Sequence, residues 1–230
     1  MNKVRLEVEL KKLNLSFDIN SLENLLVDTL KTNEKFNLTA IKDEEAFREL
    51  MIYDSALPLT LLDFDNKKVL DVGTGAGYPG LVLALMSKGE FTLLDSTKKK
   101  IDHINEYVKD NNIKNVIGVS SRAEDYINNN RDKFDIVIAR AVSSLPILCE
   151  LCLPFVKAGG YFVAMKGLKG EEELDQSKNA VRVLGGEVSS INRVNLPESN
   201  EVRINIVIKK IKKGNSKYPR KYQDIINKPL

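Results

Sequence analysis

The residues best placed for chemistry lie in a glycine-rich run that follows an apolar segment ending in Asp71. Four glycines fall within the next residues: Gly73, Gly75, Gly77 and Gly80. Glycine adopts backbone angles that side chains exclude, and it lets the main chain approach a ligand closely. A second apolar segment ends in Asp95, at a spacing that suits a carboxylate accepting hydrogen bonds from ribose hydroxyls. The pattern predicts a nucleotide-like cofactor held between a strand and a helix.

Two cofactor classes fit this pattern. The run Gly75–Gly80 matches G-x-G-x-x-G, the fingerprint of a dinucleotide site. A dinucleotide places its pyrophosphate over this first turn, where the carboxylate of Asp71 would repel it. S-adenosylmethionine has no phosphate, and its ammonium and sulfonium groups suit a nearby carboxylate. We therefore expect S-adenosylmethionine. There are two alternatives. The chain is a nicotinamide-dependent oxidoreductase, or the glycine-rich turn binds no cofactor and only packs a helix on a sheet.

The composition limits the class of protein. The 230 residues are 43% hydrophobic, which allows one domain with a substantial core and a small extension. No run approaches the roughly 20 apolar residues of a membrane span, and the N-terminus lacks the apolar core of a secretion signal. Cys149 and Cys152 have no second pair or nearby histidine, so we interpret them as apolar fillers. We expect a cytoplasmic protein without a membrane partner or a metal.

The positive charge is concentrated near the C-terminus. The whole chain carries a net charge of +3, whereas residues 209–230 alone contain eight Lys or Arg and one Asp. Clustered cations beside tyrosines can contact phosphates and stack on bases. The sequence predicts an RNA-binding segment here, with a solvated tail as the alternative. The candidate RNA-binding residues are Lys212, Lys213, Lys217, Tyr218, Arg220 and Lys221.

The order of predicted elements indicates an α/β fold. Apolar spacing over residues 22–30 predicts a helix that Ser21 caps, and another helix follows over residues 44–62. From residue 67 strands and helices alternate, which is typical of a parallel sheet covered on both faces. We expect helices near 79–87, 97–112, 122–129 and 144–157, and one starting near 171. We expect strands near 67–72, 90–95, 115–120, 134–140, 160–166, 187–194 and 202–210.

With the last two strands antiparallel, this is a doubly wound, mostly parallel seven-stranded sheet, Rossmann-like, as in class I methyltransferases. We expect three parts along the chain. Residues 1–65 form an N-terminal helical extension, residues 66–210 form the S-adenosylmethionine-binding domain, and residues 211–230 form a basic C-terminal tail.

Further candidates lie at the carboxyl ends of the strands, where ligands bind in doubly wound sheets. Ala123 and Glu124 follow the third predicted strand, where a backbone amide and a carboxylate can address an adenine edge. Arg140 ends an otherwise apolar strand and is suited to hold a phosphate or carboxylate bidentately. The alternatives are a helix cap for Asp95, a first-turn acid for Glu124 and a structural ion pair for Arg140.

No general base is evident near these positions. The one histidine, His103, lies in a lysine-rich predicted helix, and no Ser/His/Asp or Cys/His set can be assembled. The Asn/Asp-Pro-Pro-Tyr/Phe motif that prepares exocyclic amines for methylation is also missing. Methyl transfer to a nitrogen with an exposed lone pair needs no base, since in-line positioning does most of the work. N7 of guanine is such a nitrogen.

Several separated motifs carry a resemblance to a known family. They are Asn37-Leu-Thr39, Asp54-Ser55, Asp71–Gly80, Leu94-Asp-Ser96, Arg122-Ala-Glu124, Ala139-Arg-Ala-Val142, Leu153-Pro154, Lys166-Gly167, Tyr218-Pro-Arg-Lys221 and Pro229-Leu230. In this combination the chain resembles the bacterial 16S ribosomal RNA guanine-N7 methyltransferases, also called the glucose-inhibited division protein B family. Two positions differ from the family: Met51 replaces its usual histidine, and Tyr222–Ile226 replaces a segment that normally contains Gly and Pro.

The resemblance implies an enzyme that uses S-adenosylmethionine to methylate N7 of a guanine in 16S rRNA of the small ribosomal subunit. It implies cofactor contacts at Gly73, Tyr78, Ala123, Glu124 and Arg140. The strand ends and the glycine motif add Asp71, Gly75 and Asp95. Arg140 and Lys166 are the candidate catalytic residues lining the cleft. We expect a monomer; a small-molecule methyltransferase of the same fold and a non-catalytic RNA-binding relative are the alternatives.

Overall fold

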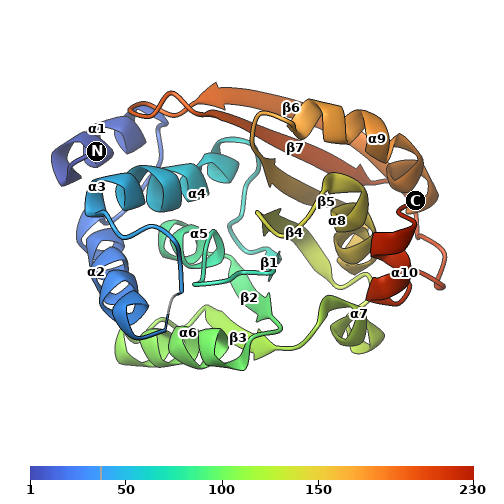
Figure 1. The fold of residues 1–230 in the computed structure, drawn as a ribbon, viewed down its shortest axis with the longest axis horizontal. Coiled ribbons are helices and arrows are strands. Elements are labelled where there is room, and N and C mark those ends of the chain that lie inside the picture. Colours follow the sequence, from blue (N-terminus) through green and yellow to red (C-terminus); the bar gives the residue numbers. More distant parts are fainter. Residues whose placement is uncertain (37) are drawn as a thin grey trace.

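The computed structural model, which describes residues 1–36 and 38–230, is built around a seven-stranded sheet with the order β3-β2-β1-β4-β5-β7-β6 (Figure 1). Strands β1 to β5 pair in parallel, whereas β7 runs antiparallel to both β5 and β6. This confirms the predicted fold class. The strands are β1 (Lys68–Val72), β2 (Glu90–Asp95), β3 (Val116–Ser120), β4 (Phe134–Arg140), β5 (Val156–Lys166), β6 (Gly186–Asn195) and β7 (Val202–Lys210).

Burial explains why these segments form strands. In β4, apolar residues from Phe134 to Ala139 are almost all buried, as expected for a central strand covered on both faces. In contrast, β6 at the sheet edge is mostly exposed and carries polar and charged side chains, which discourages pairing with another chain.

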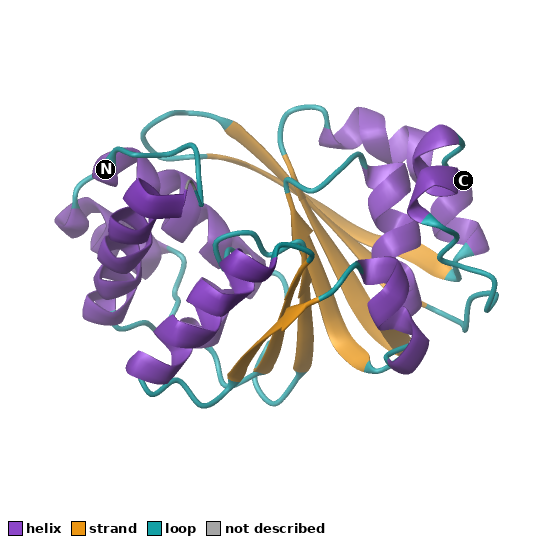
Figure 2. Ribbon diagram, turned by 60° about the horizontal axis from the view of Figure 1, so that its bottom comes forward, coloured by secondary structure: helices purple, strands orange, loops and turns teal. Residues whose placement is uncertain are grey.

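Helices cover both faces of the sheet (Figure 2). One face carries α1 (Lys3–Lys12), α2 (Ile19–Phe36), α3 (Glu44–Phe47), α4 (Asp54–Ala56), α5 (Gly80–Met86) and α6 (Lys98–Asp110). The other face carries α7 (Ala123–Tyr126), α8 (Leu145–Cys152), α9 (Gly170–Val183) and α10 (Tyr222–Asn227). Two apolar cores result, one on each side of the sheet.

The N-terminal helices differ from the prediction in detail. The predicted helix over 44–62 consists of α3, a π-helical turn (Arg48–Tyr53), α4 and a 3-10 turn (Leu57–Thr60). Ser21 does not cap α2, because the helix already begins at Ile19; the carboxylate of Asp18 accepts from the Asn20 amide at 3.0 Å instead. Asn37, part of one family-like motif, lies outside the described residues.

Two side-chain contacts join the N-terminal helices to one another and to the sheet. Arg48 donates to both carboxylate oxygens of Glu23 at 2.8 Å, which ties the π-helical turn to α2. The hydroxyl of Tyr78, just after β1, lies 3.0 Å from Thr29 Oγ1 on α2. The helical extension therefore packs against the glycine-rich turn and shares its core.

The C-terminal segment is anchored on α8. Glu150 is fully buried, and its carboxylate accepts three hydrogen bonds from Arg220: one from the backbone amide and two from the guanidinium, at 2.6–2.8 Å. Ile225 of α10 is also fully buried. The segment beyond the sheet is thus docked at the end of the molecule opposite the N-terminus (Figure 1). Among the described residues, no helix has the length and apolarity needed to cross a bilayer.

Candidate functional site

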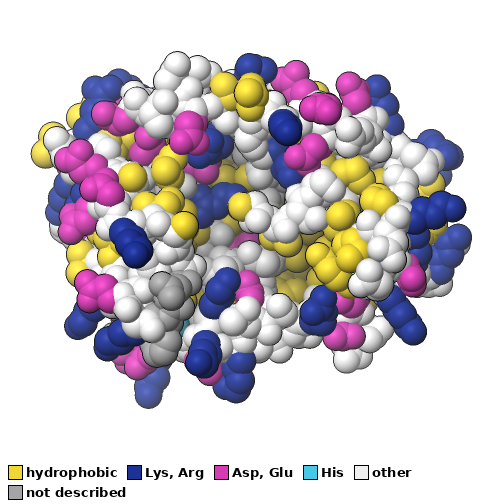
Figure 3. Space-filling view, in the orientation of Figure 1, with side chains coloured by type: hydrophobic (Ala, Val, Ile, Leu, Met, Phe, Trp, Pro, Cys, Tyr) yellow, Lys and Arg dark blue, Asp and Glu magenta, His cyan; other side chains and the backbone are white. Residues whose placement is uncertain are grey.

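A cavity of about 940 Å³ opens at the carboxyl ends of the parallel strands. The space-filling view shows it as a hollow in the middle of the molecule (Figure 3). Its wall includes residues at the ends of β1, β2, β4 and β5, together with residues from the N-terminal segment and from α10. Nearly all sequence-predicted cofactor residues lie on it, namely Gly73, Gly75, Tyr78, Asp95, Ala123, Glu124 and Arg140, and so does Lys166.

The turn after β1 needs glycine for two reasons. Gly73 and Gly75 have φ angles of 72° and 60°, in the left-handed region that disfavours side chains. At Gly73 an added Cβ would lie 2.5 Å from a methyl carbon of Val142, so the turn and the loop after β4 are in close contact. At Gly75 an added Cβ would meet no atom within 4 Å, because this stretch of backbone borders open space.

Asp71 holds this turn from beneath. It is fully buried, and its Oδ2 accepts from Thr74 Oγ1 at 2.7 Å and from the Gly80 amide at 2.9 Å. Burial raises its pKa to about 6, although both hydrogen bonds favour the ionised form. It does not line the cavity, so the predicted direct cofactor contact needs correction. The side chain of Asp71 turns inward to support the loop because two loop donors lie there.

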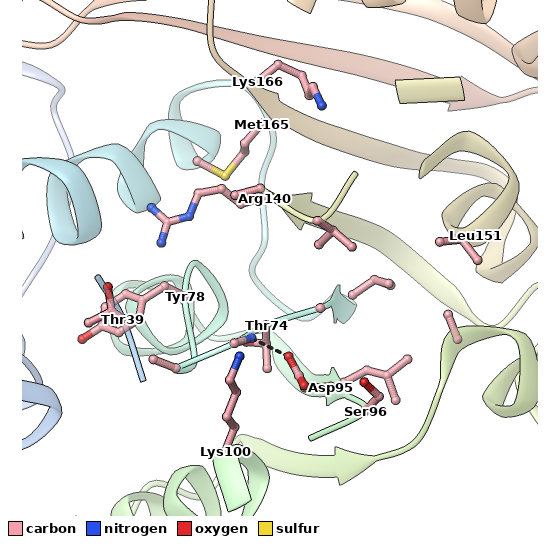
Figure 4. A pocket seen from close by; sticks show the side chains of 18 of the residues that line it. Thr39, Thr74, Tyr78, Asp95, Ser96, Lys100, Arg140, Leu151, Met165 and Lys166 are labelled. Atoms are coloured by element: carbon pink, nitrogen blue, oxygen red, sulfur yellow. Dashed lines mark hydrogen bonds between the residues drawn. The ribbon is translucent and has the colours of Figure 1, made fainter. Parts of the chain in front are cut away.

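Asp95 at the end of β2 faces the cavity and is only half-buried. Its Oδ2 accepts from the Gly75 amide at 3.0 Å (Figure 4), and its Oδ1 accepts from the Thr97 amide at 2.8 Å. Each carboxylate oxygen has a further lone pair, so Asp95 can accept additional hydrogen bonds from hydroxyl groups in the cavity. The glycine turn and the second strand-end carboxylate thus form one unit.

Ala123 and Glu124 begin α7, beside Asp95. Glu124 Oε1 accepts from Arg122 Nε at 2.7 Å, and the side chain is largely buried at 16% exposure. The Arg122 guanidinium lies over the ring of Tyr222, with its central carbon 5.1 Å from the ring centroid. This end of the cavity therefore combines a carboxylate, a guanidinium and an aromatic ring.

At the opposite end, Arg140 extends toward the N-terminal segment (Figure 4). Its Nη1 donates to the Leu50 carbonyl at 2.9 Å and lies 3.4 Å from Asp54 Oδ2. Arg203 of β7 donates from Nε to the same oxygen at 3.1 Å. Asp54 Oδ1 is buried without a partner. Arg140 therefore positions the N-terminal wall, and its guanidinium is not free to hold a phosphate bidentately as predicted.

Lys166 and Tyr78 likewise have structural partners. Lys166 Nζ donates to the Ser143 carbonyl and to Glu173, both at 2.7 Å, which links β5 with the loop before α8 and with α9. Tyr78 is 3% exposed, and its ring packs edge-on against Phe47. Both residues border the cavity, and their polar atoms bond to other protein groups.

The predicted RNA-binding residues fall into two groups. Lys212, Lys213, Lys217 and Lys221 are exposed, and Figure 3 shows Lys and Arg side chains gathered along this edge of the molecule. Tyr218 is 6% exposed and packs in the core, so its ring does not present a face to a base. Arg220 is committed to Glu150. The predicted RNA contacts of Tyr218 and Arg220 are therefore corrected: both residues have structural roles.

Residues outside the predicted set complete the cavity. They include Met51, Asp54, Lys100, Arg203 and Tyr222. Nothing in the sequence distinguished Lys100 or Arg203 from the many other lysines and arginines of the chain.

His103 lies outside the cavity, with Nε2 at 3.4 Å from Asp28. Both cysteines are fully buried, which raises the pKa of each thiol. In the described ranges no group of three potential ligand side chains could hold a metal ion.

Solved structures with this fold define the class. TYW2 from M. jannaschii, in complex with AdoMet, has a TM-score of 0.57 and 18% identity, covering 70% of this chain and 76% of its own. An rRNA methylase from Streptococcus thermophilus has a TM-score of 0.51 and 16% identity, covering 70% and 95%. The fold is that of the Rossmann-like class I methyltransferases.

Sequence comparison identifies the family. A protein-family model described as "rRNA small subunit methyltransferase G" matches residues 18–202, and the chain belongs to this family. A Ribosomal RNA small subunit methyltransferase G from Fusobacterium nucleatum is 39% identical over 96% of this chain and 97% of its own length. A protein of the same name from Acetivibrio thermocellus is 43% identical, covering 88% and 85%.

The buried carboxyl of Asp71 predicts a pH dependence of stability. Its pKa is about 6 in the folded protein and 3.8 ordinarily, so the folded state binds the proton more tightly. The resulting stabilisation is present at low pH and is lost as pH rises through about 4 to 6. Asp71→Asn cannot titrate. As pH rises from about 4 to 6, the wild type should therefore lose stability relative to Asp71→Asn. The difference between their free energies of unfolding should change by on the order of 2–3 kcal/mol. Urea unfolding of both proteins measures the difference; a value independent of pH would contradict the assignment.

Proposed function

We propose that this protein transfers a methyl group from S-adenosylmethionine to N7 of a guanine in 16S rRNA of the small ribosomal subunit. The observation that carries the proposal is the hydrogen bond between the Gly75 amide and Asp95, at the mouth of the cavity. It joins the glycine turn to a carboxylate that can accept from ribose hydroxyls, in a chain that belongs to the rRNA small subunit methyltransferase G family.

The residues of the cavity fit this cofactor. Gly75 leaves open space beside Asp95, where an adenosine ribose can approach the backbone. Asp95 would accept the ribose hydroxyls, and Ala123 and Glu124 would face the adenine. Asp71 lies beneath the turn without lining the cavity, so its role is to hold the turn that borders the cofactor. When bound, S-adenosylmethionine supplies an electrophilic methyl group.

The protein's contribution to the reaction is positioning. Three of the four acidic side chains that line the cavity pair with cations: Asp54 with two arginines, Glu124 with Arg122, and Glu173 with Lys166. The fourth, Asp95, accepts from two backbone amides and is assigned to the ribose. None of the residues that line the cavity is a histidine. A guanine N7 has an exposed lone pair, so no side chain needs to remove a proton. Aligning the nitrogen with the methyl group then supplies the catalysis.

Direct methylation tests the proposal. The protein, S-adenosylmethionine with a labelled methyl group, and small subunits from cells lacking this gene should yield one guanosine methylated at N7, located by mass spectrometry of 16S rRNA fragments. Since no base titrates, the single-turnover rate should be nearly flat between about pH 6.5 and 8.5, where a histidine would lose its proton.

Two results would contradict the proposed mechanism or the proposed substrate. A log-linear rise of the rate with a slope near one over that pH range would indicate a group that must lose a proton. Labelling of small molecules without labelling of rRNA would instead identify a small-molecule methyltransferase of the same fold.

The exposed lysines of the tail are proposed to contact RNA phosphates. Each lost contact removes roughly 0.7–0.9 from the slope of log affinity against log salt. Replacing four of them with alanine should therefore flatten the slope by about 3 and weaken binding at low salt. The variant carries K212A, K213A, K217A and K221A. Filter binding to 16S rRNA over a range of salt concentrations measures both quantities.

A matched control uses four exposed lysines of α1 and α2, at the other end of the molecule: Lys3, Lys11, Lys12 and Lys31. If both quadruple variants change the slope equally, only the net charge matters. If the tail variant binds like the wild type, the tail does not contact RNA.

A further inference from the structure

The C-terminal segment reaches back to the cofactor cavity. Tyr222, the first residue of α10, lines the same cavity as Gly73 and Asp95, although it follows the last strand of the sheet. The residues that follow it contain neither glycine nor proline before Pro229, so the segment can continue as a helix. The helix then places Ile225 in the core.

Strong contacts hold the backbone that leads into this position. Arg220, two residues before Tyr222, bonds to the fully buried carboxylate of Glu150. Arg131 Nη2 donates to the Tyr218 carbonyl at 2.6 Å. Because a charge-assisted bidentate pair fixes direction as well as distance, the backbone that carries Tyr222 to the cavity wall is held in place.

The ring meets the end of the cavity formed by α7. The Arg122 guanidinium lies over the ring at 5.1 Å from its centroid, and Arg122 also donates to Glu124 at 2.7 Å. Ala123 lies between these two residues in the chain and lines the cavity as well. The aromatic ring from the tail and the residues that follow β3 thus form one continuous wall.

We propose that Tyr222 contacts the adenine of the bound cofactor and closes that end of the cleft, so that the basic tail forms part of the cofactor site. This inference rests on the proposed function, which places adenine beside Ala123 and Glu124. An aromatic ring offers a planar apolar surface to a purine, and its hydroxyl is not needed for that contact. The segment that carries the RNA-binding lysines therefore also stabilises the cofactor complex.

Calorimetric titration of the full-length protein with S-adenosylhomocysteine tests this. Tyr222→Leu keeps an apolar side chain but removes the aromatic ring, and should weaken binding roughly tenfold, the effect of losing one base-stacking contact. Tyr222→Ala should weaken it at least as much. Tyr222→Phe keeps the ring and should bind within about twofold of the wild type. Gln223→Ala, at the exposed neighbouring position, is the matched control and should leave the affinity unchanged.

The outcomes separate the two proposals. If the wild type does not bind S-adenosylhomocysteine, the proposed function fails. If the wild type binds and Tyr222→Leu binds equally well, with an unchanged melting temperature, the function stands and the role of Tyr222 is overturned. Equal weakening by Tyr222→Phe and Tyr222→Leu would also overturn it, because the hydroxyl rather than the ring would then carry the contact.

Discussion

The buried carboxylate of Asp71 is the constraint on which the cavity depends. Its two hydrogen bonds, to Thr74 and to the Gly80 amide, fix the glycine turn near both of its ends. With the turn fixed, the Gly75 amide meets Asp95 on the neighbouring strand. The cost is a buried acid whose second oxygen has no partner and whose pKa is raised to about 6. Burial of Asp71 is therefore destabilising, while its hydrogen bonds give the turn a defined shape.

Segments outside the sheet complete the cleft through ion pairs. Asp54 from the N-terminal segment lies between Arg140 of β4 and Arg203 of β7, so one carboxylate joins three parts of the chain. At the other end, the pair between Glu150 and Arg220 docks the tail. Removing one partner of a buried pair leaves an uncompensated charge, which is strongly unfavourable. The cleft is therefore assembled from both termini, with the sheet as its floor.

Much of this architecture could be predicted from the sequence. Alternating apolar strands and helices defined the sheet, and because parallel strands end at one edge, Asp95 and Glu124 were expected beside the glycine turn. The direction of a side chain could not be predicted. Asp71 turns inward because two donors lie beneath the turn, and Tyr218 is buried because the tail docks on α8. Such contacts join residues far apart in the chain, and local patterns do not report them. For the same reason the tail was predicted only as an RNA-binding element.

We propose that the cleft beside the glycine turn binds S-adenosylmethionine through Asp95. Calorimetric titration of wild type and Asp95→Ala tests it most directly, with Asp102→Ala, an exposed acid of α6, as the control. Losing charge-assisted hydrogen bonds worth ~2–3 kcal/mol should weaken S-adenosylmethionine binding roughly 30- to 150-fold, with no change in the control. Unchanged affinity in a folded Asp95→Ala protein, or binding of NADH in place of S-adenosylmethionine by the wild type, would contradict the claim.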